Sequence, residues 1–253
     1  MRKQINLVLT LIFAIVAASS SHGNAQDPQK LVQNAFNYWR GNASISTVVM
    51  TIHRPEWQRA MTLKAWTRGE TESLFRIIDP PKDSGNGTLK KGREMWMFNP
   101  KINRIIKVPP SMMSQAWMGS DFSNNDLAKS DSLLNDYIHK ITGTETHEGK
   151  KVFLIESLPK PDAPVVWGML RLKVREDYIL LSEVYFDEDF EPVKIMTADD
   201  IQMLGGKLFP RTWKMQKVDA DSEYTLLQYE ELSFKPRLES SLFTLSNLRN
   251  PRR

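Results

Sequence analysis

The sequence contains no cysteine, and this absence removes several classes of chemistry at once. Disulfide bonds, thiolate nucleophiles, cysteine-ligated zinc and iron–sulfur clusters all require that residue. A lipid-modified cysteine is excluded as well, so the chain is not itself a lipoprotein.

Histidine is also scarce, and its spacing offers no metal site. Beyond the first 25 residues only His53, His139 and His147 occur, and none forms an HxH or HExxH pattern. We expect His53 and His147 to face solvent. The carboxylates Asp199 and Asp200 are adjacent, so in a strand they would point to opposite faces rather than work as a pair. The sequence therefore predicts no catalytic residue, no metal and no cofactor.

Net charge is small for a chain of this size. The 34 basic and 30 acidic side chains give a formal net charge of +4. This balance argues against a nucleic-acid partner, because such binding relies on neutralising phosphates.

Long hydrophobic runs are missing except near the start. Residues 7–18 form an apolar run after Arg2 and Lys3, and Gly23-Asn24-Ala25 supplies small residues for cleavage. This three-part pattern is typical of a secretory signal peptide. The run is too short for a spanning helix, which needs about 20 residues. We predict a signal peptide over residues 1–25, cleaved near Ala25, and one domain over residues 26–253.

What the sequence does contain is one amphipathic helix followed by many short alternating segments. Asp27 and Pro28 suit the start of a helix whose apolar face carries Leu31, Ala35 and Trp39. From Ser44 onwards apolar and polar residues alternate, and turn residues separate the segments. Further strands are expected at residues 59–67, 71–79, 88–91, 94–98, 103–108, 137–146, 151–157, 165–175, 179–187, 192–199, 207–217 and 223–234.

Connections this short favour antiparallel pairing. With about 10–12 strands and few helices, a closed or half-open antiparallel β-barrel would bury the sheet faces and edges. Residues 109–134 interrupt the alternation and carry three Met, Trp117 and Phe122 among polar residues. We expect this stretch to form a loop with short lid helices, which together with the N-terminal helix covers a concave apolar cavity.

Large apolar side chains mark the candidate binding residues. For any one of them, an ordinary aromatic-rich core is an alternative, but Met and Trp within a polar loop favour a cavity that adapts to a lipid. The residues expected to line this cavity and its lid are Trp66, Phe75, Trp96, Phe98, Met113, Trp117, Met118, Phe122, Trp167, Met169, Phe186, Met196, Trp213 and Met215.

Several stretches resemble the LolA-like outer-membrane lipoprotein-sorting proteins, a group of periplasmic carriers. They are residues 87–92 (GTLKKG), 94–100 (EMWMFNP), 104–108 (RIIKV) and 117–127 (WMGSDFSNNDL). The resemblance implies a half-open barrel with inserted lid helices, a cavity that holds acyl chains, and a periplasmic location.

These features together predict a non-enzymatic carrier. It would bind acyl chains of lipoproteins or other lipids and deliver them toward the outer membrane, as a monomer and with an inner-membrane transporter as a possible partner. One alternative is a lipid-sensing or accessory subunit of an RND-type exporter or envelope regulator. A hydrolase on a similar barrel is a further alternative.

Overall fold

The computed structural model describes residues 26–251, and this part of the chain opens with helix α1 (Pro28–Arg40). The Asp27 side chain caps the helix by accepting hydrogen bonds from the backbone N–H groups of Gln29 and Lys30. Gly41, at φ +64°, ends it, and a Cβ there would lie 2.6 Å from the Phe234 ring. The predicted helix and its cap are thus confirmed, whereas the predicted signal peptide lies outside the described residues.

All the strands in residues 26–251 belong to one antiparallel sheet of thirteen strands. The expected mainly β architecture is confirmed, with slightly more strands than expected and without closure into a barrel. The strands are β1 (Ala43–Arg54), β2 (Trp57–Arg68), β3 (Glu72–Asp79), β4 (Gly87–Lys91), β5 (Glu94–Asn99), β6 (Arg104–Lys107), β7 (Tyr137–His147), β8 (Lys150–Pro159), β9 (Met169–Arg175), β10 (Leu180–Phe186), β11 (Pro192–Leu204), β12 (Lys207–Lys217) and β13 (Tyr224–Lys235).

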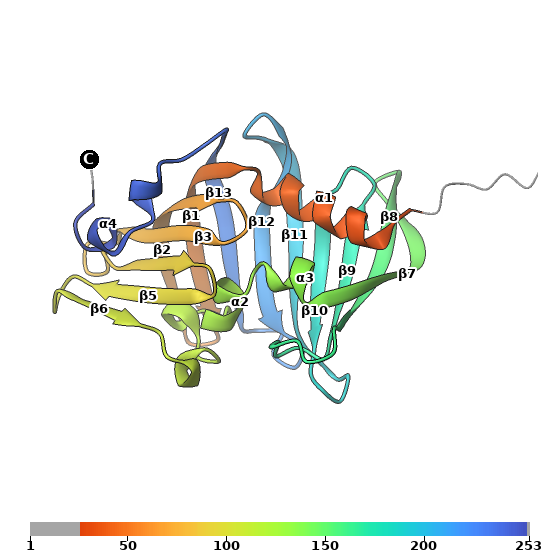
Figure 1. The fold of residues 1–253 in the computed structure, drawn as a ribbon, viewed down its shortest axis with the longest axis horizontal. Helices are drawn as coiled ribbons and strands as arrows, with labels where there is room; N and C mark the ends of the chain where they lie inside the picture. Colours follow the sequence, from red (N-terminus) through yellow and green to blue (C-terminus); the bar gives the residue numbers. More distant parts are fainter. Residues whose placement is uncertain (1–25, 252–253) are drawn as a thin grey trace, which may run out of the picture.

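The order of the strands explains how the sheet stays open. Strands β1 to β6 form one run of neighbours, β7 to β13 form another, and the pairing of β1 with β13 joins the two runs. Strands β6 and β7 are therefore consecutive in the sequence but lie at opposite edges of the sheet. The sheet curves strongly, and α1 crosses its concave side (Figure 1).

Residues 108–136, here called the bridging segment, must span the distance between these two edges. The segment contains η1 (Pro110–Met112), η2 (Trp117–Gly119), α2 (Asn124–Ala128) and α3 (Ser132–Asn135), as expected for a loop with short helical turns. It crosses the open side of the sheet, and α3 contacts α1 there (Figure 1).

The opposite face of the first run of strands is covered by the end of the chain. There η3 (Ser240–Leu242) and α4 (Leu245–Arg249) bring Phe243 and Leu248 against Leu74 and Leu89. Arg76 donates hydrogen bonds to backbone carbonyl groups of α4. Within residues 26–251, no helix combines the length and the hydrophobicity needed to cross a membrane.

Candidate functional site

The larger of two adjoining cavities lies between α1, the bridging segment and the concave face of the sheet. Its volume is about 240 Å³, which exceeds the roughly 150 Å³ of an engineered cavity that binds benzene. Most of its wall is apolar. Its lining includes Val32, Ala35, Phe36 and Trp39 of α1, Leu127 and Leu133 of the bridging segment, and Leu170, Leu172, Val174, Leu180 and Leu227 of the sheet.

A second cavity of about 110 Å³ adjoins the first on the side of strands β1 to β3. The two cavities share lining residues, so they are neighbours separated only by side chains. The shared residues are Trp39, Arg40, Phe75, Trp117, Leu227 and Tyr229. Together they form an elongated apolar space under α1 and the bridging segment.

Six of the fourteen residues expected at a cavity or lid lie in the wall of the larger cavity. They are Phe75, Trp117, Phe122, Trp167, Met196 and Trp213. They come from five strands or loops far apart in the sequence, and the curvature of the sheet brings them together.

The other eight do not line either cavity, and strand alternation explains most of them. Trp66, Trp96 and Phe98 lie on the opposite face, in the cluster covered by α4. Ala65 and Thr67, the neighbours of Trp66, face the second cavity instead.

The same alternation explains Met169 and Phe186. Their neighbours Leu170 and Tyr185 face the larger cavity, so Met169 and Phe186 point to the other side of the sheet. Met215 is fully buried behind the cavity wall, and Met118 packs against the same cluster. Met113 packs with Met95 in a small cluster of its own.

Trp117 anchors the bridging segment to the sheet. Its side chain is 4% exposed, its ring meets Phe75 edge-on at 5.4 Å, and its Nε1 donates to Thr88 Oγ1 at 3.0 Å. A residue held this firmly is part of the core as well as of the cavity wall. Substituting it would therefore destabilise the fold along with any ligand contact.

Four aspartates, spaced five residues apart, tie the bridging segment to basic residues of the sheet and its turns. Each forms an ion pair with a different residue, and the sites lie along the second half of the segment, from residue 121 to residue 136. The pairs are Asp121 with Arg54, Asp126 with Lys194, Asp131 with Lys90, and Asp136 with Arg93. The segment is thus closed over the cavities by charge pairing as well as by apolar contact.

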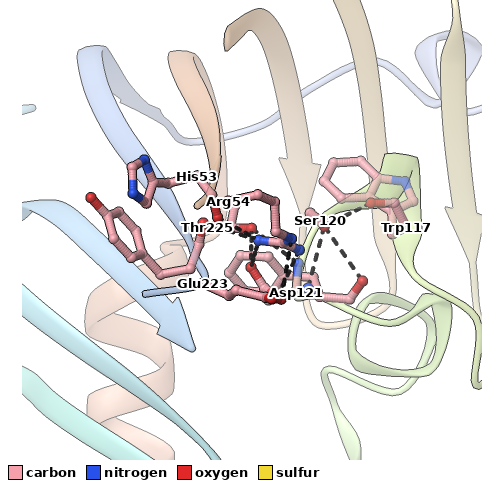
Figure 2. A network of polar contacts seen from close by, with 9 residues as sticks. His53, Arg54, Trp117, Ser120, Asp121, Glu223 and Thr225 are labelled. Carbon is pink, nitrogen blue, oxygen red and sulfur yellow. Dashed lines mark hydrogen bonds and ion pairs between the residues drawn. The ribbon is translucent and has the colours of Figure 1, made fainter. Parts of the chain in front are cut away.

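Asp121 makes the densest of these contacts (Figure 2). Its two carboxylate oxygens accept from Arg54 at 2.9 and 3.1 Å, and Oδ2 also accepts from the Thr225 hydroxyl at 2.6 Å. Nearby His53 stacks on Tyr224 at 4.7 Å with its Nδ1 buried, so it does not simply face solvent as expected.

Asp126 carries charge into the wall of the larger cavity. Its Oδ2 accepts from Lys194 Nζ, and both side chains are 7% exposed. Lys194 also lies 4.8 Å from the ring centre of Tyr185 and 4.9 Å from that of Trp167. Glu183, on the same strand as Tyr185, lines the cavity too, and burial, followed by the charge of Asp126, raises its pKa to about 7.

Arg40 places a second buried charge where the two cavities meet. It donates to the Glu72 carbonyl and to Ser73 Oγ, both at 2.8 Å, and burial lowers its pKa to about 10. The cavity therefore contains a few fixed polar groups in an apolar wall, which is the usual composition of a small-molecule site.

Sequence reasoning missed these polar wall residues because it searched for apolar ones. One signal was present: Glu183 and Lys194 each lie two residues from a large side chain of the cavity wall, Tyr185 and Met196, and so share its face of the strand. A charged residue at such a position needs a buried partner. Among residues 26–251, no three His, Asp or Glu side chains are arranged to hold a metal ion.

A protein-family model described as "Uncharacterized protein" matches residues 69–250. The chain belongs to this family. No curated protein matches it.

Three crystal structures resemble the chain over 88% of its length. A DUF1329 family protein from Desulfovibrio piger is 21% identical, with a TM-score of 0.78 over 100% of that chain. An outer-membrane lipoprotein-sorting protein domain from Vibrio parahaemolyticus is 19% identical, with a TM-score of 0.75 over 98% of that chain. A LolA superfamily protein from Nitrosomonas europaea is 18% identical, with a TM-score of 0.72 over 99% of that chain. The fold is therefore LolA-like, which confirms the resemblance seen in the sequence.

Proposed function

We propose that the protein is a non-enzymatic carrier that binds acyl chains of lipoproteins or other lipids. The observation that carries this proposal is the elongated apolar space of two adjoining cavities, enclosed by α1 and the bridging segment. The likeness to a lipoprotein-sorting domain and to a LolA superfamily protein supports it.

Apolar contact alone would supply useful affinity. Each buried methylene group contributes about 0.8 kcal/mol, so a chain of several methylenes offsets much of the cost of association. α1 and the bridging segment lie across the concave side, so movement of either one would widen the entrance to the cavity for a ligand. Such a carrier would work in the periplasm, receive its cargo from an inner-membrane transporter and release it toward the outer membrane.

The first test is whether a lipid is bound. Protein purified without detergent is expected to carry lipid, detected by native mass spectrometry and identified after solvent extraction. Delipidated protein is expected to take up a fluorescent fatty acid. A protein that neither carries lipid nor takes up the probe would contradict the proposal.

A cavity-filling variant tests whether the ligand binds inside the molecule. Leu227 lines both cavities, so Leu227→Trp is expected to reduce uptake at least tenfold by occupying the space of the ligand. The matched control is Leu158→Trp, the same change at a strand residue that is 48% exposed. Equal uptake by the two variants would show that the probe binds outside the cavities.

A further inference from the structure

Asp126, in the wall of the larger cavity, forms an ion pair with Lys194 whose bonding is incomplete. Asp126 Oδ2 accepts from the backbone N–H of Ser123, at the start of α2, and from Lys194 Nζ. Asp126 Oδ1 is buried and has no hydrogen-bond partner among the described residues. A buried carboxylate oxygen without a partner is costly, because it has lost its water and gained nothing in return. Because Asp126 lines the larger cavity, a small rotation of its side chain would turn Oδ1 toward a ligand group that donates a hydrogen bond, and this bond would remove the cost.

The charges around Asp126 favour the same kind of ligand group. Lys194 is already held by Asp126 Oδ2 and by the faces of the Tyr185 and Trp167 rings. Glu183 adds a second carboxyl group to the cavity wall, and its pKa of about 7 leaves it partly ionised at neutral pH. The wall also contains two cations, but each is already bonded: Lys129 donates to the Pro164 carbonyl group, and Arg40 donates to the Glu72 carbonyl group and to Ser73 Oγ. The atom without a partner beside Asp126 is an acceptor, so a neutral donor or a cation fits it better than an anion does.

Strand register keeps these groups together on one face. Tyr185 of β10 pairs directly with Lys194 of β11, and Glu183 lies two residues before Tyr185. Residues two apart in a strand share a face. α2 of the bridging segment then adds Asp126, so this polar cluster is complete only when the segment covers the cavity.

We propose that Asp126 and Glu183, with Lys194 paired to Asp126, form a head-group subsite for a lipid whose polar end donates hydrogen bonds through a hydroxyl or an ammonium group. The proposal rests on the proposed function, because it assumes that the apolar body of the ligand fills the larger cavity. It adds the orientation of the ligand, with its polar end enclosed beside α2 and not left at the surface.

The other buried ion pair of the bridging segment provides a matched control. Asp131 pairs with Lys90 at 2.8 Å, and the two side chains are 7% and 1% exposed. Neither residue is in the wall of a cavity. Asp131→Asn therefore repeats the chemical change of Asp126→Asn, in the same segment and at similar burial, without touching the proposed subsite.

The test compares four ligands that share one alkyl chain, by displacement of Nile red from delipidated protein. Lauryl alcohol and laurylamine donate hydrogen bonds, methyl laurate only accepts them, and laurate is an anion. The wild type is expected to bind the alcohol and the amine about tenfold more tightly than methyl laurate, since a hydrogen bond to a charged group is worth that much. Laurate is expected to bind most weakly. Comparison of lauryl alcohol with laurylamine shows whether the subsite prefers a neutral or a cationic donor.

Asp126→Asn is expected to lose most of the preference for donors, and Asp131→Asn to keep it. If Asp126→Asn does not fold, Glu183→Gln is the second variant. It is expected to weaken laurylamine binding more than lauryl alcohol binding, because it removes a negative charge and keeps a polar group.

Equal affinity of the wild type for all four ligands would overturn the subsite and leave the apolar carrier intact. If Asp131→Asn also lost the preference for donors, this preference would reflect closure of the bridging segment and not contact with Asp126. Binding of none of the four would overturn the proposed function together with the subsite.

Discussion

The pKa values of two buried residues, Glu183 and His139, are shifted in opposite directions. Burial, followed by the charge of Asp126, raises the pKa of Glu183 to about 7, while Lys194 and the Tyr185 hydroxyl act the other way. Burial, followed by the charge of Lys160, lowers the pKa of His139 to about 4, while a backbone hydrogen bond with Leu133 acts the other way. Both residues are therefore favoured in their neutral forms.

Their effects on stability have opposite signs. A carboxyl group with a raised pKa stabilises the fold at low pH, and this contribution is lost as pH rises from about 4.5 to about 7. A histidine with a lowered pKa stabilises the fold at neutral pH, and this contribution is lost as pH falls from 6.5 to about 4. Over the shared range the two contributions oppose each other.

We therefore predict that removing either residue exposes the influence of the other. As pH increases from 4.5 to 8, the free energy of unfolding of Glu183→Gln should rise relative to that of the wild type by on the order of 2–3 kcal/mol. As pH increases from 4 to 7, that of His139→Asn should fall relative to the wild type by a similar amount. Urea unfolding across this pH range measures both. Parallel pH profiles for the wild type and both variants would contradict the prediction.

Individual residues also mark the limit of what the sequence could predict. The alternation of apolar residues correctly identified strands, but it could not say which face of each strand was inward. Trp66 and Trp96 are large and apolar, yet they face α4, while smaller Ala65 and polar Thr67 face a cavity. A shift of one residue exchanges the two faces of a strand, so side-chain character alone does not decide which face is inward.

At the scale of elements, the sequence indicated the bridging segment well but not its attachment. The loss of alternation at Pro109 correctly set off an irregular stretch with short helical turns. Its four aspartates gave no such signal, because their partners come from β1, β4, β11 and the turn before β5. Only the curvature of the sheet brings those partners to one side.

The four ion pairs should contribute unequally to closure of the segment. Asp121 accepts several hydrogen bonds, and its side chain is 6% exposed, whereas Arg93, the partner of Asp136, is 47% exposed. Asp121→Asn is expected to cost about 1.5–3 kcal/mol, and Asp136→Asn less than about 1 kcal/mol, since exposed pairs are weak.

Hydrogen exchange of residues 108–136 measures this difference directly. In Asp121→Asn these amides should exchange about tenfold faster or more, because the segment opens more often. The amides of β8 and β9, which lie away from the Asp121 contacts, serve as the internal reference. Faster exchange in both regions would indicate general destabilisation, and no change in either would rule out Asp121 as a closing contact.

At the scale of the whole molecule, the antiparallel pairing of neighbouring strands was predictable, and the overall arrangement of the strands was not. Short turns indicate that strands consecutive in the sequence pair with each other. This holds throughout the sheet except at two places. β1 pairs with β13, and β6 is separated from β7 by the full width of the sheet. Neither long-range relationship has a local signal, yet together they create the concave side that holds the cavities.

An enclosed cavity links ligand binding to the stability of the whole fold. A ligand that binds only the folded state at 100 times its Kd stabilises that state by about 2.7 kcal/mol, which corresponds to a rise in Tm of roughly 5–10 °C for a chain of this size. We expect this rise when lipid is added to delipidated wild-type protein and to Leu158→Trp. Leu227→Trp should show little rise, because its indole occupies space that both cavities share. Its own Tm without lipid is the deciding comparison: a value at or above that of the delipidated wild type means that the indole filled an empty space. A value well below it, together with a lipid-induced rise as large as that of the wild type, would mean that the space at Leu227 was already packed and that the ligand lies elsewhere.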